Sequence, residues 1–139
     1  MKTPAILIAI LAILIGIVPY FFNCQYDGKA LTLANGRQVP MKCYWTAQAA
    51  LVVAVPLLVV GVMMAFSQRR ETMRALTILG AILGLFAILL PTQLIGVCQH
   101  AGASCNLVMK PALIFMGVLV ISISLVSLVI SERRAELIP

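Results

Sequence analysis

The segment PAILIAILAILIGIVPYFF, residues 4–22, contains no Asp, Glu, Lys, Arg or His. A helix rises 1.5 Å per residue, so about 20 apolar residues span the roughly 30 Å hydrocarbon core of a bilayer. A helix on the surface of a soluble domain keeps a polar face toward water, and this segment has none. The segment therefore predicts a transmembrane helix.

Three later segments have the same composition, and the chain as a whole is 63% hydrophobic and only 10% charged. Soluble domains carry about 25% charged residues, so the sequence indicates a membrane protein. We predict an all-α fold, a single bundle of four transmembrane helices. The predicted spans are about residues 4–22, 46–66, 75–97 and 111–130.

The first span is expected to remain in the mature protein. Phe21, Phe22 and Asn23 stand directly before Cys24. A signal peptidase site needs small residues at such a position, and a lipoprotein signal needs one just before the cysteine. Neither pattern is present, so we interpret residues 4–22 as a helix and not as a cleaved leader.

Four spans place both termini on one side of the membrane, with the loop 67–74 and the tail 131–139. Most of the ten basic residues lie on this side: Lys2, Arg69, Arg70, Arg74, Arg133 and Arg134. Cytoplasmic loops carry the excess of Lys and Arg, so cytoplasmic termini are predicted. The opposite loops, 23–45 and 98–110, contain all four cysteines, and this clustering fits an oxidising compartment outside the cytosol.

Several function classes are disfavoured. No ionisable residue lies within a predicted span, which argues against an ion-coupled transporter. The sequence has no phosphate-binding glycine loop and no set of residues for a hydrolase triad. Its basic residues are spread over short loops at the membrane surface, where they meet lipid headgroups, so a nucleic acid partner is not expected. We expect a protein that is not an enzyme.

The loop 23–45 contains one segment that resembles a soluble element. KALTLANGRQV, residues 29–39, alternates apolar and polar residues on both sides of Asn35-Gly36. Both of these residues tolerate positive φ, which a two-residue hairpin turn requires. We predict a short β-hairpin within a small extracytoplasmic cap. Because an isolated hairpin is marginally stable, we expect a disulfide or packing against the other loop to hold it.

The cysteines Cys24, Cys43, Cys98 and Cys105 allow three interpretations. The favoured one is two structural disulfides, with Cys24–Cys43 and Cys98–Cys105 closest in sequence and cross-pairing between the loops as an alternative. The second is a thiol–disulfide redox protein, since membrane enzymes that form disulfides are also four-helix proteins with cysteine pairs in two outer loops. The C-x-x-C pair that tunes a reactive thiolate is missing here.

The third interpretation is a metal or haem site, for which copper(I) would suit the soft ligands. Its candidate ligands are Met41, Cys98, His100, Cys105 and Met109. A Cys-x-His pattern is weak by itself, and a single loop histidine is more often solvated than ligating. We therefore predict no bound metal and no cofactor.

Small residues recur at helical spacing in all four spans and predict close packing of the helices. The clearest pattern is Gly80-x-x-x-Gly84, which we interpret as a helix-packing motif. The alternative is that this seam binds a larger membrane partner. A polar cluster is predicted at the outer interface, where Gln48 should be hydrogen-bonded to another helix. Its members are Trp45, Thr46, Gln48, Gln93, Asn106 and Lys110.

Two segments, VPMKCYWTAQA (residues 39–49) and CNLVMKPAL (residues 105–113), begin the second and fourth helices. They resemble a family of small four-helix bacterial membrane proteins classed as a domain of unknown function. The resemblance implies a place in the bacterial cytoplasmic (inner) membrane and an accessory role beside permeases of the macrolide-exporter type. It carries over no catalytic residues.

From these arguments we predict a non-enzymatic accessory subunit of a larger, transporter-type membrane assembly. Its partners would be the lipid bilayer and a permease. A thiol–disulfide redox protein is the second hypothesis, and a copper- or haem-handling membrane protein is the third.

Overall fold

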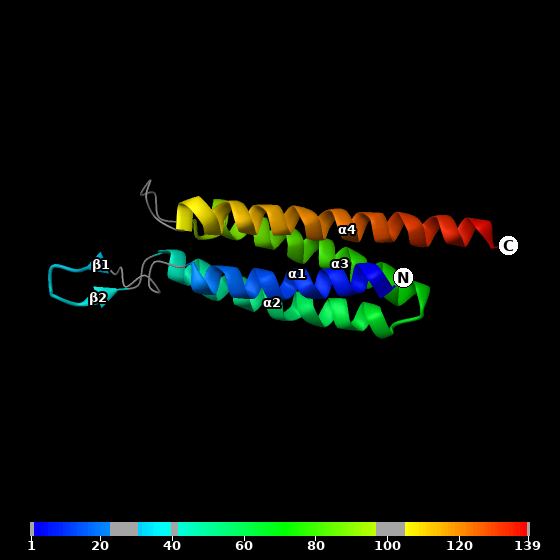
Figure 1. Cartoon of the computed structure of the whole chain (residues 1–139), viewed down its shortest axis with the longest axis horizontal. Coiled ribbons are helices and arrows are strands. Elements are labelled where there is room, and N and C mark those ends of the chain that lie inside the picture. The colour runs from blue at the N-terminus through cyan, green and yellow to red at the C-terminus, as the bar shows by residue number, and fades with distance from the viewer. Residues whose placement is uncertain (1, 23–30, 40–41, 97–104, 139) are drawn as a thin grey trace.

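The computed structural model describes residues 2–22, 31–39, 42–96 and 105–138, which form four long helices and one small hairpin. The helices are α1 (Lys2–Phe21), α2 (Lys42–Phe66), α3 (Arg70–Leu89) and α4 (Lys110–Leu137). They run side by side, with the two chain termini at one end of the bundle (Figure 1). We call this the terminal end, and the opposite end, beyond which the β-hairpin lies, the hairpin end.

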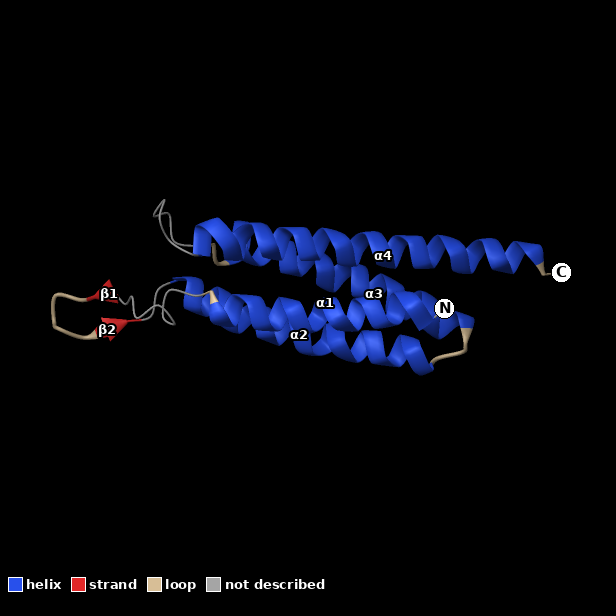
Figure 2. Cartoon of the chain, viewed as in Figure 1, coloured by secondary structure: helices blue, strands red, loops and turns tan. Residues whose placement is uncertain are grey.

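All four helices are long and apolar enough to cross a membrane, and the fold is almost entirely helical (Figure 2). Three of them extend past the apolar segments. α2 begins at Lys42, α3 at Arg70, and α4 continues to Leu137. Glu, Arg and Ala are strong helix formers, so SERRAEL, residues 131–137, stays helical although it is polar. The length of an apolar segment therefore underestimates the length of its helix.

The bundle is built from two antiparallel pairs. α1 packs most extensively against α2, and α3 against α4, while the contacts between the pairs are fewer. One core runs through all four helices, and its largest fully buried side chains include Ile8, Leu57, Met109, Leu113 and Val120. Helices that are neighbours in sequence thus form the two closest pairs, and both pairs contribute to one shared core.

In the α1/α2 pair the closest approach lies at Gly61. A Cβ atom there would stand 2.9 Å from the backbone nitrogen of Ala9 and 3.2 Å from the carbonyl oxygen of Ala5. Lipid is as apolar as leucine, so helices associate in a membrane through close backbone contact between small residues. Gly61 provides this contact near the terminal end.

In the α3/α4 pair the closest approach lies at Gly84 and Gly117. A Cβ at Gly117 would stand 2.9 Å from the Gly84 carbonyl oxygen, and one at Gly84 would stand 3.2 Å from the Gly117 carbonyl oxygen. A Cβ at Gly80 would lie 3.2 Å from Ser124 Oγ. Both glycines of the Gly80-x-x-x-Gly84 motif therefore face α4, and α4 covers the seam that was considered for an external partner.

The hairpin consists of β1 (Leu31–Thr32) and β2 (Gln38–Val39), paired antiparallel with Leu31 opposite Val39. Gly36 has a φ of +75°, which a glycine adopts without strain. Residues 32–39 are all exposed. The expectation that the hairpin packs as a cap is therefore not met by these residues, because a strand pair this short has no apolar face large enough to bury.

Candidate functional site

The hairpin end is held by an irregular end of the third helix. Pro91 has no N–H to continue the regular pattern, and residues Leu90–Leu94 form a π-helical turn, η1. The N–H groups of Ile95 and Gly96 both donate to the carbonyl oxygen of Leu90, at 3.1 Å and 3.2 Å. Gly96 has a φ of +78°. Proline and glycine together therefore turn the chain away from the helix axis.

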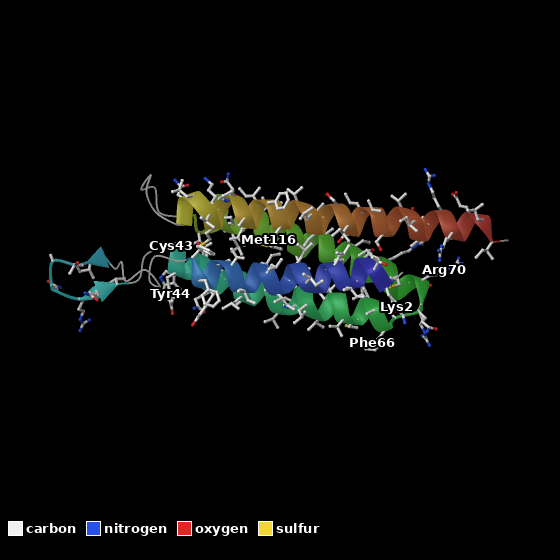
Figure 3. All side chains as sticks on the ribbon, viewed as in Figure 1. Lys2, Cys43, Tyr44, Phe66, Arg70 and Met116 are labelled. Atoms are coloured by element: carbon white, nitrogen blue, oxygen red, sulfur yellow. The ribbon has the colours of Figure 1, made fainter. Side chains whose placement is uncertain are left out.

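Thr46 links this turn to α2. Its hydroxyl donates to the Gly96 carbonyl oxygen at 2.7 Å, and its side chain is fully buried. Cys43, one turn earlier in α2, is also fully buried, in the same core cluster as Met109 (Figure 3). A second π-helical turn, η2 (Cys105–Met109), leads into α4. The first turns of α2 and α4 thus contribute buried side chains to one end of the core.

The residues of the predicted outer polar cluster differ in their burial. Thr46 is buried and bonded across helices, whereas Trp45 and Gln93 are exposed. Gln48, Asn106 and Lys110 are half-buried. Among the residues that the structure describes, Gln48 makes no hydrogen bond to a neighbouring helix, so the bond expected for it is not found there. Successive helical residues point about 100° apart, so residues at one membrane depth need not share a face.

Most of the cysteine hypothesis concerns residues outside the described ranges. Cys24, Met41, Cys98 and His100 lie there, so the disulfide pairing and the soft-ligand site stay predictions. Among the residues that the structure describes, no three His, Cys, Asp or Glu side chains gather in a metal-binding group. Burial of Cys43 and Met109 indicates packing, since a reactive thiolate is usually partly exposed in an electropositive setting.

The terminal end contains a pocket with basic lining residues that sequence analysis did not predict. It has a volume of about 430 Å³ and is lined from all four helices. Three of its lining residues are basic, namely Lys2, Arg70 and Arg134. Met64 and Met73, both buried, contribute apolar surface. Lys2 and Arg70 lie at this end of the bundle in Figure 3.

The pocket also lies beside the start of α3. The residue before that helix, Arg69, makes no side-chain cap, although the first four N–H groups of a helix have no partner within it. Ser67 and Gln68, which precede it, and Ser131 of α4 complete the polar lining. The pocket therefore combines positive side chains, hydrogen-bond donors and a helix N-terminus, which is an arrangement suited to an anion.

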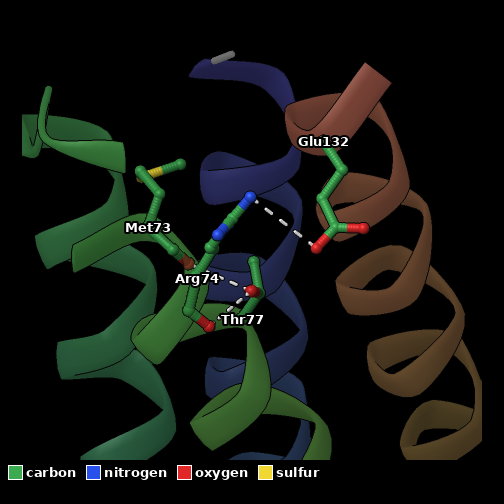
Figure 4. Close-up of polar contacts among 4 residues, drawn as sticks. All are labelled: Met73, Arg74, Thr77 and Glu132. Carbon is green, nitrogen blue, oxygen red and sulfur yellow. Dashed lines mark hydrogen bonds and ion pairs between the residues drawn. The ribbon is translucent and has the colours of Figure 1, made fainter. Parts of the chain in front are cut away.

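A surface ion pair ties α3 to α4 near this pocket. Arg74 Nη2 lies 3.8 Å from Glu132 Oε1, with both side chains about half exposed (Figure 4). The Thr77 hydroxyl, one turn farther along α3, donates to the carbonyl oxygens of Arg74 and Met73 at 2.8 Å and 3.0 Å. Arg74 is thus engaged outside the pocket, and neither it nor Glu132 lines the cavity.

Two apolar grooves run along the membrane-facing surface. One lies between α1 and α2, has a volume of about 370 Å³, and includes the small residues Ala12, Gly16 and Ala54. The other lies between α1 and α4 and has a volume of about 310 Å³. The small-residue spacing of α1 can be read from the sequence, but which face of the helix stays open depends on where its neighbours pack.

Residues 6–130 match a family described as "Domain of unknown function (DUF4418)". The chain belongs to this family. The matched segment contains nearly all of the four helices, so the DUF4418 domain is this bundle. Membership agrees with the resemblance to an uncharacterised family seen in the entries to the second and fourth helices. No match was found among curated proteins or among solved structures.

Proposed function

We propose that this DUF4418 protein is a non-enzymatic accessory subunit that binds a transmembrane helix of a larger membrane protein in the α1/α2 groove. The observation that carries the proposal is the small-residue lining of that groove. Gly61, Gly84 and Gly117 are already used in packing within the bundle. Gly16 is also buried, but it lies with Ala12 and Ala54 at the floor of an open groove, and a Cβ there would make only ordinary contacts, 3.4 Å from Ala54 Cβ and Leu51 Cδ2.

The chemistry of the groove favours a helix as its occupant. Small residues permit a second backbone to come close, and the remaining lining side chains are large and apolar: Ile13, Ile17, Tyr20, Phe21, Leu51, Val55 and Leu58. Tyr20 and Phe21 lie at the membrane interface, where aromatic rings anchor helices. A permease-type protein, as the family resemblance implied, supplies such helices.

A matched pair of substitutions in α2 tests this proposal. Val55 lines the groove and is 61% exposed, whereas Val52 is 73% exposed and does not line it. The experiment places a photoreactive residue at position 13 and measures the yield of cross-linked partner in native membranes. Because Val55→Trp fills the groove, it should reduce this yield at least fivefold. Val52→Trp adds the same ring to a lipid-facing site and should leave the yield within twofold.

Mass spectrometry of the cross-linked product identifies the occupant. A protein with many transmembrane segments supports the proposal, provided that its capture is lost in Val55→Trp. A cross-linked dimer of this 15.0 kDa chain, or a yield that the two tryptophan variants reduce equally, would contradict it.

The proposal includes cytoplasmic termini and a disulfide-strapped extracytoplasmic loop region. Cytoplasmic termini are supported by the excess of basic residues at the terminal end. The disulfides are supported by the presence of all four cysteines in the two predicted loops opposite the termini, 23–45 and 98–110. Intact-mass measurement with and without reductant tests the disulfides. Reduction of two disulfides adds four hydrogen atoms, so the mass should rise by about 4 Da. Four alkylatable thiols in unreduced protein would exclude the strap.

A further inference from the structure

We propose that the terminal-end pocket binds the phosphate headgroup of an anionic phospholipid, with one acyl chain of that lipid in the α1/α4 groove. This proposal does not depend on the α1/α2 groove or on a protein partner. It rests on three observations: the charge of the pocket, its hydrogen-bond donors, and an apolar groove whose lining begins at the residues adjacent in sequence to those of the pocket.

The charge of the pocket selects an anion. Lys2, Arg70 and Arg134 line it, and no carboxylate stands among its lining residues. Of the acidic residues at this end, Glu132 pairs with Arg74, while Glu71 and Glu136 lie on the exposed surface outside the lining. Basic pockets between transmembrane helices at the cytoplasmic side are known to bind anionic lipid headgroups.

The donors of the pocket suit phosphate oxygens in particular. Two guanidinium groups offer paired N–H donors that match phosphate geometry. Ser67, Gln68 and Ser131 add neutral donors. The start of α3 adds backbone N–H groups and the positive end of the helix dipole. A phosphate group would therefore receive charge and hydrogen bonds from three helices and from the α2–α3 connection.

The groove between α1 and α4 begins one residue along the chain from this pocket on both helices. Lys2 and Ser131 line the pocket, and the adjacent residues Thr3 and Ile130 line the groove. Farther along, the groove is bounded by Leu7, Ile123 and Val126. Its Ser122 hydroxyl already donates to the Val118 carbonyl oxygen at 2.8 Å. A basic pocket with an apolar groove beginning at the adjacent residues matches a molecule with a charged head and an acyl chain, and free phosphate would use only the pocket.

Native mass spectrometry of the full chain in detergent tests the proposal, with phosphatidylglycerol, phosphatidylcholine of the same acyl chains, and inorganic phosphate as probes. Phosphatidylglycerol should bind at least fivefold more tightly than phosphatidylcholine. Arg134→Gln should remove most of this preference. Arg133→Gln is the matched control, because it removes the same charge from the neighbouring exposed residue, which does not line the pocket.

A second matched pair tests the acyl-chain groove. Val126 lines this groove and is 58% exposed, whereas Val129 is 51% exposed and does not line it. Val126→Trp should weaken phosphatidylglycerol binding at least threefold, and Val129→Trp should not change it.

Three results would overturn the proposal. The first is equal binding of the two lipids, and the second is an equal loss in Arg134→Gln and Arg133→Gln, which would indicate only a general effect of net charge. The third is binding of inorganic phosphate with no effect of Val126→Trp on the lipid, which would indicate a phosphate site without a lipid groove.

Discussion

The two helix pairs of the bundle are closed at opposite ends. The α1/α2 pair comes closest at Gly61, against Ala5 and Ala9, near the terminal end, whereas the α3/α4 pair comes closest at Gly84 and Gly117, nearer the hairpin end. Each pair borders an open site toward its other end: the apolar groove beside Gly16 for α1/α2, and, for α3/α4, the basic pocket that α1 and α2 also line. A tight glycine contact placed off-centre therefore joins two helices and leaves the rest of their length free to border another site.

The pairs also differ in the chemistry of their contact surfaces. The α1/α2 surface is built from alanine, glycine and branched aliphatic residues, while the α3/α4 surface includes the buried hydroxyl of Ser124, which faces Gly80. Within the described residues, Ser124 Oγ has no hydrogen-bond partner. Membrane helices commonly use such small polar residues at close contacts, and here they accompany the glycines of α3.

The largest effect is expected from Gly117→Leu. A Cβ at this position would lie 2.5 Å from Ile88 Cγ1 and 2.9 Å from the Gly84 carbonyl oxygen, and the backbone atom cannot move away by a change of rotamer. We expect a loss of about 3 kcal/mol in the free energy of unfolding, measured by circular dichroism as sodium dodecyl sulfate is added to mixed micelles. Gly16→Ala, with contacts of 3.4 Å, is the control; an equal loss in both variants would refute the off-centre contact.

A substitution at the closest contact of the α1/α2 pair should have a smaller effect on stability. Gly61→Ala adds one methyl group 2.9 Å from the Ala9 nitrogen and 3.2 Å from the Ala5 carbonyl oxygen. It should cost about 2 kcal/mol in the same unfolding measurement. Because the clash lies at the terminal end of α1/α2, hydrogen exchange should rise first in the early turns of α1 and not in α4. Faster exchange in α4 alone would contradict the division into two pairs.

Thr46→Val tests the link between the pairs at the hairpin end. The substitution keeps the shape of the buried side chain but removes the hydroxyl that donates to the Gly96 carbonyl oxygen at 2.7 Å. A hydrogen bond between membrane helices contributes about 0.6 kcal/mol on average and up to about 1.7 kcal/mol, so we expect a loss of about 1 kcal/mol. Thr92→Val is the matched control, because the exposed Thr92 hydroxyl bonds only within its own segment, to Ile88 and Leu89.

The smallest effect is expected from Glu132→Gln at the free end of α3/α4. The 3.8 Å ion pair with Arg74 is about half exposed on both sides, and such pairs contribute about 0.5 kcal/mol or less. Unfolding should change by no more than this, and raising the salt concentration should reduce the difference between variant and parent. A loss above about 1 kcal/mol would show that the ion pair, and not Gly84 and Gly117, holds this pair together.

Composition alone predicts the four helices, because a charge-free segment of this length has one stable arrangement in a bilayer. It predicts less about their ends, since the polar residues 131–137 are helical for reasons of propensity. The turn at Asn35-Gly36 follows from local conformational preference, and β1 and β2 do pair across it. Each of these features depends on residues close together in the sequence.

The two candidate sites depend instead on which helices are neighbours. Periodicity places Gly80 and Gly84 on one face of α3, but only the packing shows that Gly117 of α4 faces them. Arg70 and Arg134 appear in the sequence as signals of membrane orientation, and they line one pocket because the ends of α3 and α4 meet. Lys2 joins them from the far end of the sequence, so no local pattern could have grouped the three.

The length of α4 has a consequence for how the chain senses its surroundings. At 28 residues against 20 for α1, α4 is about 42 Å long, and its last seven residues extend about 10 Å beyond the apolar part of the helix. The Debye length at physiological ionic strength is about 8 Å. Arg133 and Arg134 stand in the first turn of that extension, so they lie less than this screening distance from the end of the apolar segment. The surface potential of the membrane should therefore act on the end of α4 but fade within two helical turns, and modest changes in salt should alter how strongly it acts.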